Sequence, residues 1–142
     1  MTDFCGLPYP ITQNSLGYFR SQCGAETIKG DLLILLLTNP GERVMMPEFG
    51  TGLRRLVFEP NDSFIKEQAR NMIINAIATW EPRIVVEQID ISTGEEAWQS
   101  LSPDDDRTQA ANVLLIRILF LEKDNINEIQ ELKLSVPLGT TN

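Results

Sequence analysis

The chain has 142 residues, with 12 lysines and arginines against 20 aspartates and glutamates, a net charge of −8, and no histidine. The absence of histidine excludes Ser-His-Asp and Cys-His catalytic systems and all His-ligated metal sites. The two cysteines alone cannot complete a Cys-only zinc site. We therefore expect no metal and no cofactor, and among enzymes only carboxylate or phosphate-loop chemistry remains open.

Length and composition predict a single globular domain that can bury a core without a disulfide or a metal. Cys5 and Cys23 are too few for a secreted disulfide scaffold and predict a reducing compartment. No signal peptide is expected, and the longest apolar run, Leu32–Leu37, is too short to span a bilayer. The acidic balance argues against nucleic acid as a partner, and no membrane is expected either.

The first 24 residues are rich in proline and glycine, which predicts an N-terminal arm followed by one domain over residues 25–142. From Ala25 to Thr38 the apolar residues follow helical spacing, although a buried strand would also fit the run Leu32–Leu37. The dominance of leucine favours a helix, which the following Asn39-Pro40 should end. This helix is apolar nearly all round, so we expect it to be covered on several sides.

The stretch Gly41–Pro60 is predicted to be a loop that is packed down or docks on a partner, because it is rich in large apolar residues. The strongest helical pattern follows, with apolar residues three and four apart from Ile65 to Trp80. Asp62 or Ser63 is expected to cap this helix. The helix should end at Glu81, because proline disfavours the helical conformation of the residue before it.

Three strands are predicted at Ile84–Ser92, Asn112–Glu122 and Glu128–Val136, with an acidic loop at residues 93–109 between the first two. The middle strand is almost continuously apolar, which predicts a central strand covered on both faces. In the last strand, leucine and valine alternate with polar residues, so one face should point inward. The predicted fold is therefore α+β, with two main helices packed on an antiparallel β-meander of about three strands.

Glu81-Pro82-Arg83 is the most informative constellation, because proline holds a glutamate and an arginine on a stiff helix-to-strand corner. An ordinary corner with a surface ion pair is the alternative explanation. Glutamates near loops could also act as the paired carboxylates of a glycosidase. Arginines lie close to them in sequence, however, and would lower their pKa, which is the wrong direction for a general acid.

Several ordered motifs resemble the baseplate wedge protein family of contractile phage tails, which includes type VI secretion baseplate components. The resemblance runs from about Thr27 to Ile91 and continues loosely to Val136. It rests on four segments: Leu37–Met45, Pro47–Leu53, Leu56–Pro60 and Trp80–Ile84. The first 24 residues and the acidic loop carry no motif of that family.

The resemblance implies a structural, non-enzymatic role as one subunit of a baseplate wedge. The expected partners are other wedge proteins of the core bundle, the tail sheath protein, and possible hub or tube-proximal proteins. The expected location is the tail baseplate of a virion, assembled in the cytoplasm of the bacterial host. The expected interface residues are Glu81, Pro82, Arg83, Gly41, Glu42, Arg43, Pro47, Phe49, Gly50, Leu132 and Leu134.

Two consequences are expected from these roles. Replacing Arg83 with alanine should leave the monomer folded but weaken wedge association. The last strand, Glu128–Val136, or its neighbour is expected to bind the sheath by β-augmentation, so a proline at Leu134 should abolish sheath nucleation and leave wedge assembly. The alternatives are a type VI secretion or tailocin baseplate component, a lysozyme-like cell-wall hydrolase, and a small regulatory adaptor that shares the fold.

Overall fold

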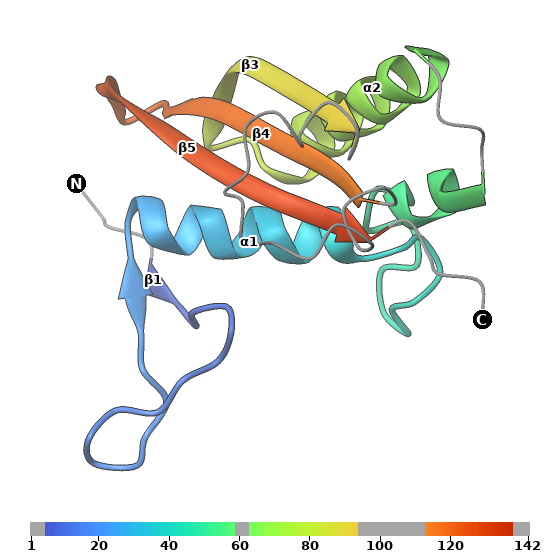
Figure 1. The fold of residues 1–142 in the computed structure, drawn as a ribbon. Coiled ribbons are helices and arrows are strands. Elements are labelled where there is room, and N and C mark those ends of the chain that lie inside the picture. Colours follow the sequence, from blue (N-terminus) through green and yellow to red (C-terminus); the bar gives the residue numbers. More distant parts are fainter. Residues whose placement is uncertain (1–4, 59–62, 94–112, 138–142) are drawn as a thin grey trace, which may run out of the picture.

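The computed structural model describes residues 5–58, 63–93 and 113–137 (Figure 1). Two helices, α1 (Ala25–Leu37) and α2 (Ser63–Trp80), pack on a three-stranded sheet. The sheet contains β3 (Ile84–Thr93), β4 (Val113–Glu122) and β5 (Asn125–Pro137). This architecture confirms the predicted α+β fold with two helices and a three-stranded meander.

The sheet is antiparallel, with the strands in the order β3-β4-β5. Lys123 and Asp124 form the two-residue turn of the predicted β4–β5 hairpin, in which Glu122 pairs with Asn125. The alternation predicted for β5 is confirmed, because Leu132, Leu134 and Val136 are buried and the residues between them are exposed. The strand begins at Asn125, three residues before the predicted start.

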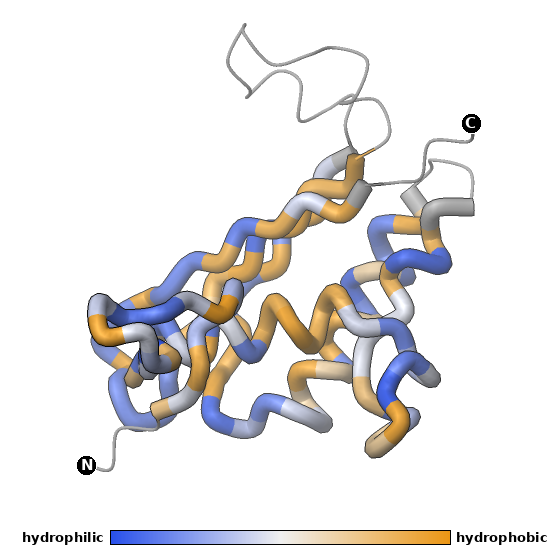
Figure 2. Tube along the Cα trace, turned by 90° about the horizontal axis from the view of Figure 1, so that it is seen from below, coloured by the Kyte–Doolittle hydropathy of each residue, from blue (hydrophilic) through white to orange (hydrophobic). Residues whose placement is uncertain are grey.

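The core lies between the two helices and one face of the sheet, which we call the inner face (Figures 1 and 2). Figure 2 shows that hydrophobic residues run along α1 and along the strands. Helix α1 begins and ends within one residue of its prediction, and it contacts α2 and β5. Its core residues are Ile28, Leu32, Leu35 and Leu36.

Strand β4 is central, as predicted, but it is not covered on both faces. Leu114, Ile116, Ile118 and Phe120 are fully buried on the inner face. On the opposite, outer face the apolar residues are only half-buried, and Arg117 is exposed. Both helices lie on the inner face, so within the described residues no element covers the outer one.

The described part of the predicted loop, Gly41–Phe58, contains one exposed and one buried segment. Leu53 and Leu56 are buried, and they belong to a short 3-10 helix, η1 (Leu53–Phe58), which was not predicted. Val44 and Met45 are exposed in the middle of the preceding loop. The first alternative, a packed-down segment, is therefore confirmed for Leu53 and Leu56. Docking of the exposed first part on a partner stays a prediction. Of the two residues predicted to cap α2, Asp62 lies outside the described residues and Ser63 is the first residue of the helix. The acidic loop, apart from Thr93, also lies outside the described residues.

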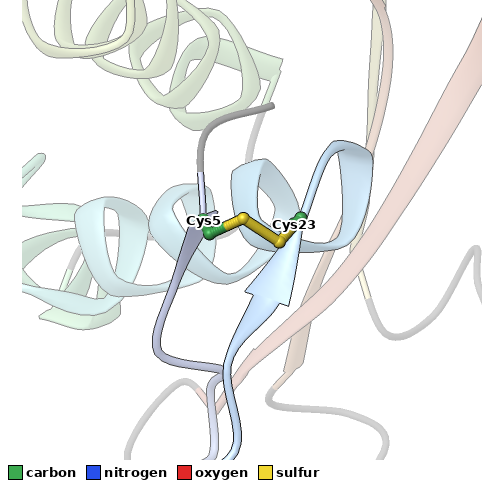
Figure 3. Close-up of a disulfide and its surroundings, with 2 residues drawn as sticks. All are labelled: Cys5 and Cys23. Atoms are coloured by element: carbon green, nitrogen blue, oxygen red, sulfur yellow. A yellow bond between two sulfur atoms is a disulfide. The ribbon is translucent and has the colours of Figure 1, made fainter. Parts of the chain in front are cut away.

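The N-terminal arm is a closed loop rather than a free segment. Its ends form two short antiparallel strands, β1 (Cys5–Gly6) and β2 (Gln22–Cys23), and a disulfide joins Cys5 to Cys23 (Figure 3). The expectation of reduced cysteines is therefore wrong, and the inference of a reducing compartment loses its basis. Between the strands the chain projects from the start of α1, away from the sheet (Figure 1).

Candidate assembly interface

The Glu81-Pro82-Arg83 corner joins α2 to β3, as predicted. Helix α2 ends at Trp80, and the amide of Glu81 still donates to the carbonyl of Ile77 at 2.9 Å. Pro82 then turns the chain, and β3 begins at Ile84. Because the proline ring restricts both its own φ and the residue before it, the helix cannot continue through the corner.

Glu81 and Arg83 form a bidentate ion pair within the chain. Arg83 donates from Nε to Glu81 Oε1 and from Nη2 to Glu81 Oε2, both at 2.5 Å. Glu81 is only 5% exposed, so this is not the ordinary surface ion pair of the alternative explanation. Its hydrogen bonds with Glu81 raise the pKa of Arg83 further above its usual range. The corner is therefore fixed as a charged, partly desolvated unit.

Asp31 is a third member of this network that the sequence did not reveal. Its Oδ2 accepts a hydrogen bond from Arg83 Nη2 at 2.6 Å, so α1 is tied to the corner across 52 residues of sequence. Nothing in the local pattern around Asp31 distinguishes it from any polar residue on a helix. The pairing of Asp31 with Arg83 could have been predicted only from knowledge of how α1 packs on the end of α2.

The loop between α1 and η1 is held by its own polar groups. Glu42 accepts hydrogen bonds from the backbone N and the side-chain Nδ2 of Asn39, at 2.9 and 2.7 Å. These bonds lower the pKa of Glu42, so Asn39, rather than the neighbouring Arg43, stabilises this carboxylate. The amide of Gly41 donates to the carbonyl of Pro47 at 2.6 Å and closes the loop.

Aromatic contacts join this loop to the end of α2. The guanidinium of Arg43 lies 3.8 Å from the ring centroid of Phe49, which is a cation–π contact. Phe49 in turn meets Trp80 edge to face, with ring centroids 5.4 Å apart. The loop and the corner therefore form one surface, around a hollow of about 260 Å³ that is lined by Asp31, Ile34, Leu35, Arg43, Phe49, Trp80, Glu81 and Arg83.

The middle of the loop presents apolar side chains to solvent. Val44 is 98% exposed and Met45 is nearly as exposed, although both sit on a well-bonded loop. Met46 has φ of 63°, a left-handed conformation that non-glycine residues rarely adopt. Strained backbone of this kind persists where the surroundings enforce it, and it is common at binding sites. These three residues are absent from the predicted site. The sequence did offer one indication of them, because large apolar side chains are unusual in a loop.

The structure brings most of the predicted interface residues together and leaves two apart. Glu81 and Arg83 line the hollow together with Arg43 and Phe49. The other predicted loop residues belong to the same loop but do not line the hollow: Gly41, Glu42, Pro47 and Gly50. Pro82 is exposed between Glu81 and Arg83. Leu132 and Leu134 lie on β5 with their side chains buried in the core. Only their main chain can therefore take part in an interface.

Two of the candidate catalytic glutamates are already engaged by other side chains of this chain. Within residues 5–58, 63–93 and 113–137, no group of three or more histidine, cysteine or acidic side chains is placed to hold a metal ion. Glu42 and Glu81 are engaged by Asn39 and Arg83. Neither α1 nor α2 has the length and uninterrupted hydrophobicity of a membrane span.

Comparison with known proteins identifies the family. Residues 22–120 match the family model of baseplate wedge protein gp25, so the chain belongs to that family. The chain is 28% identical over 113 residues to baseplate wedge protein gp25 of Enterobacteria phage T4, covering 80% of this chain and 75% of that protein. The resemblance inferred from the motifs is confirmed, and family membership supports a structural role in a baseplate.

Solved structures agree with this fold. A candidate tail lysozyme from Geobacter sulfurreducens superposes with a TM-score of 0.65 at 28% identity, covering 82% of this chain and 93% of that one. A chain of the anti-feeding prophage baseplate gives 0.61 at 17% identity, covering 98% and 89%. A chain of the postcontracted pyocin R2 baseplate gives 0.51 at 20% identity, covering 96% and 100%. At 17% and 20% identity, these two baseplate chains show only that this chain shares their fold.

Proposed function

We propose that this chain is a non-enzymatic subunit of a contractile-tail baseplate wedge, which joins the wedge core and offers a platform for sheath assembly. The observation that carries the proposal is the surface formed by the buried Glu81–Arg83 pair and the loop at Gly41–Gly50. Both motifs lie within the matched family region, and the structure places them around one hollow. The proposal covers phage tails, tailocins and type VI secretion systems alike.

The wedge core is the proposed partner of this surface. Arg83 is already paired with Glu81 and Asp31, so the corner keeps its geometry before any partner arrives. Val44 and Met45 would contribute apolar area from the same loop as Arg43 and Phe49. A pre-organised surface loses little conformational entropy on binding, which favours assembly at low subunit concentration. Hub or tube-proximal proteins are further proposed partners, without a surface assigned to them.

The sheath is the proposed partner of strand β5, which is an edge of the sheet. β-Augmentation uses main-chain hydrogen bonds at such an edge, and the side chains of Leu132 and Leu134 then remain in the core. The proposed test by proline at Leu134 therefore needs a different position, because that change would also open the core. Gln130 and Lys133 are not core residues and lie on opposite faces of β5. Their amides therefore point to opposite edges of the strand, one toward β4 and one toward solvent.

A proline on β5 is expected to reduce sheath nucleation at least tenfold and to leave wedge assembly intact. Hydrogen exchange of the isolated protein first shows which of the Gln130 and Lys133 amides faces solvent, and the faster one is replaced by proline. That amide bonds to no strand of the sheet, so the free energy of unfolding should change by no more than about 1 kcal/mol. Sheath polymerisation on purified baseplates is the measurement, with alanine at the same position as the control. Normal polymerisation on the proline variant would reject β5 as the edge.

The proposed location is the baseplate of a tail particle, assembled in the bacterial cytoplasm. A tail gene cluster lacking this chain is expected to yield no sheathed particles, and expression of the chain from a plasmid should restore them.

The hydrolase alternative predicts instead that the purified protein clears peptidoglycan in a zymogram, and that Glu42→Gln, Glu48→Gln or Glu81→Gln abolishes the clearing. Clearing that depends on one of these glutamates would overturn the non-enzymatic proposal.

A further inference from the structure

The N-terminal arm, residues 5–23, lies almost wholly outside the region that matches the family, which begins at residue 22. Its base is held in three ways. The Cys5–Cys23 disulfide and the β1–β2 pairing join its ends beside α1 (Figure 3). The chain at Tyr9 also crosses α1 at Gly30, where an added Cβ would lie 3.5 Å from the Tyr9 nitrogen.

The outer part of the arm, residues 11–20, is ordered by its own hydrogen bonds, and we call it the tip. Asn14 Oδ1 accepts hydrogen bonds from the amides of Leu16 and Tyr18, both at 3.0 Å. The amide of Arg20 donates to the carbonyl of Thr12 at 2.9 Å. The tip is therefore a short closed hairpin, which would lose little conformational entropy on binding.

The tip exposes large apolar side chains that the fold does not use. Leu16 is 78% exposed and Tyr18 is 71% exposed, and Ile11 and Phe19 are similarly open to solvent. Four such residues on ten positions of an ordered, projecting hairpin are unlike the singly scattered apolar residues of ordinary surfaces. Tyrosine and phenylalanine are also enriched in the buried centres of protein interfaces.

We propose that the tip inserts into an apolar groove on a different protein subunit of the same assembly, with a carboxylate of that subunit facing Arg20. The inference rests on the proposed structural role in a baseplate and adds a second contact to it. This contact lies at the opposite end of α1 from the loop at Gly41–Gly50, and both project away from the sheet (Figure 1).

Charge favours a protein groove over a lipid surface. Arg20 is the only charged residue between Cys5 and Cys23, whereas the whole chain has a net charge of −8. Bacterial membranes carry anionic lipids, and stable attachment of a peripheral hairpin to them relies on several basic residues. One arginine on a strongly acidic protein does not supply that attraction.

Charge also disfavours a second copy of this chain as the partner. Two hollows of the described residues are candidates to receive the tip, and each is lined by two cations. Arg117 and Lys133 line the hollow of about 660 Å³ on the outer face of the sheet. Arg43 and Arg83 line the hollow beside the corner. The carboxylates that line these hollows, Asp31, Glu81 and Asp90, already pair with Arg83 and Arg117. Neither hollow therefore offers Arg20 an unpaired carboxylate, so the groove belongs to another subunit.

Photo-crosslinking in assembled particles tests the inference. p-Benzoylphenylalanine replaces Tyr18 in the full chain, expressed with its tail gene cluster, and a second chain carries it at Ile74 as the control. Ile74 is a partly exposed apolar residue of α2 that belongs to none of the proposed surfaces. We expect Tyr18 to cross-link to one site on one other subunit, at least tenfold more efficiently than Ile74. Arg20→Glu should lower that yield at least fivefold.

Other outcomes would overturn the inference. Incorporation of the chain into particles with no excess cross-linking at Tyr18 would reject the tip contact and leave the proposed function standing. So would cross-linking between copies of the chain, or Tyr18-dependent sedimentation of the purified protein with phosphatidylglycerol-phosphatidylethanolamine vesicles. Absence of the chain from particles would instead refute the proposed function, and the inference with it.

Discussion

Replacing Arg83 with methionine is expected to lower the free energy of unfolding by about 3 kcal/mol, because Glu81 would remain buried without its cation. Glu81 accepts hydrogen bonds from Arg83 on both carboxylate oxygens and is almost fully buried. The Arg83 side chain is 27% exposed, so the lower end of the range for broken buried ion pairs applies. Urea unfolding at neutral pH measures the change.

Arg117→Met is the matched control for this prediction. Arg117 also pairs with two carboxylates, Asp90 and Glu131, but all three side chains are substantially exposed on the outer face of the sheet. Its replacement should therefore cost no more than about 1 kcal/mol. Equal costs for the two substitutions would show that the burial of Glu81 does not matter.

The double variant Glu81→Leu/Arg83→Met separates folding from assembly. Apolar residues in place of both partners leave no buried charge, so stability should return to within about 1 kcal/mol of the original protein. If the corner contacts the wedge core, this stable variant still fails to form wedge complexes on size-exclusion chromatography. Normal complexes would confine the ion pair to a role in folding. The sequence predicts that replacing Arg83 weakens association. Because Glu81 is buried, the structure predicts in addition that the replacement lowers the stability of the fold.

Replacing Gly50 with alanine is expected to destabilise the protein by about 2–4 kcal/mol, because the new Cβ has no room and the backbone is left-handed. An added Cβ at Gly50 would lie 2.3 Å from the carbonyl oxygen of Thr38, and φ is +121°. The same oxygen accepts the hydrogen bond from the Thr51 amide at 3.1 Å, so moving it would disturb the end of α1.

Gly41→Ala is the control for Gly50, because it isolates the conformational cost. Gly41 has φ of +95°, but an added Cβ would meet nothing within 4 Å. Its replacement should therefore cost about 1 kcal/mol, from backbone conformation alone. Chemical denaturation of both variants measures the difference. Similar costs at the two glycines would mean that the contact with Thr38, and hence the close packing of the loop on α1, contributes nothing.

Local sequence was sufficient for most elements of this fold. The helical spacing from Ile65 to Trp80, the alternation in β5 and the proline at position 82 each act over a few neighbouring residues. Such patterns reflect the pitch of a helix, the pleat of a strand and the ring of proline, so they predict structure without knowledge of distant contacts. The family motifs were readable for the same reason, since each is a short contiguous segment.

Other features depended on which residues meet across the fold. Asp31 joins the Arg83 network because α1 packs beside the corner, and Cys5 meets Cys23 because the arm folds back on itself. Residue type alone could not decide which large residues of the loop after α1 become buried. Leu53 packs into the core and Val44 remains in solvent.

The amino-acid sequence by itself therefore determined the two main helices, the three strands of the sheet, their order and the charged corner of this protein. Tertiary structure alone decided that the Glu81–Arg83 pair is partly desolvated and that the arm presents an apolar tip. It also decided that no element of residues 5–58, 63–93 and 113–137 covers the outer face of the sheet. The physical reason is that burial and pairing are properties of contacts between distant segments. Those contacts turn an ordinary helix-to-strand turn into a stiff surface around which an assembly can form.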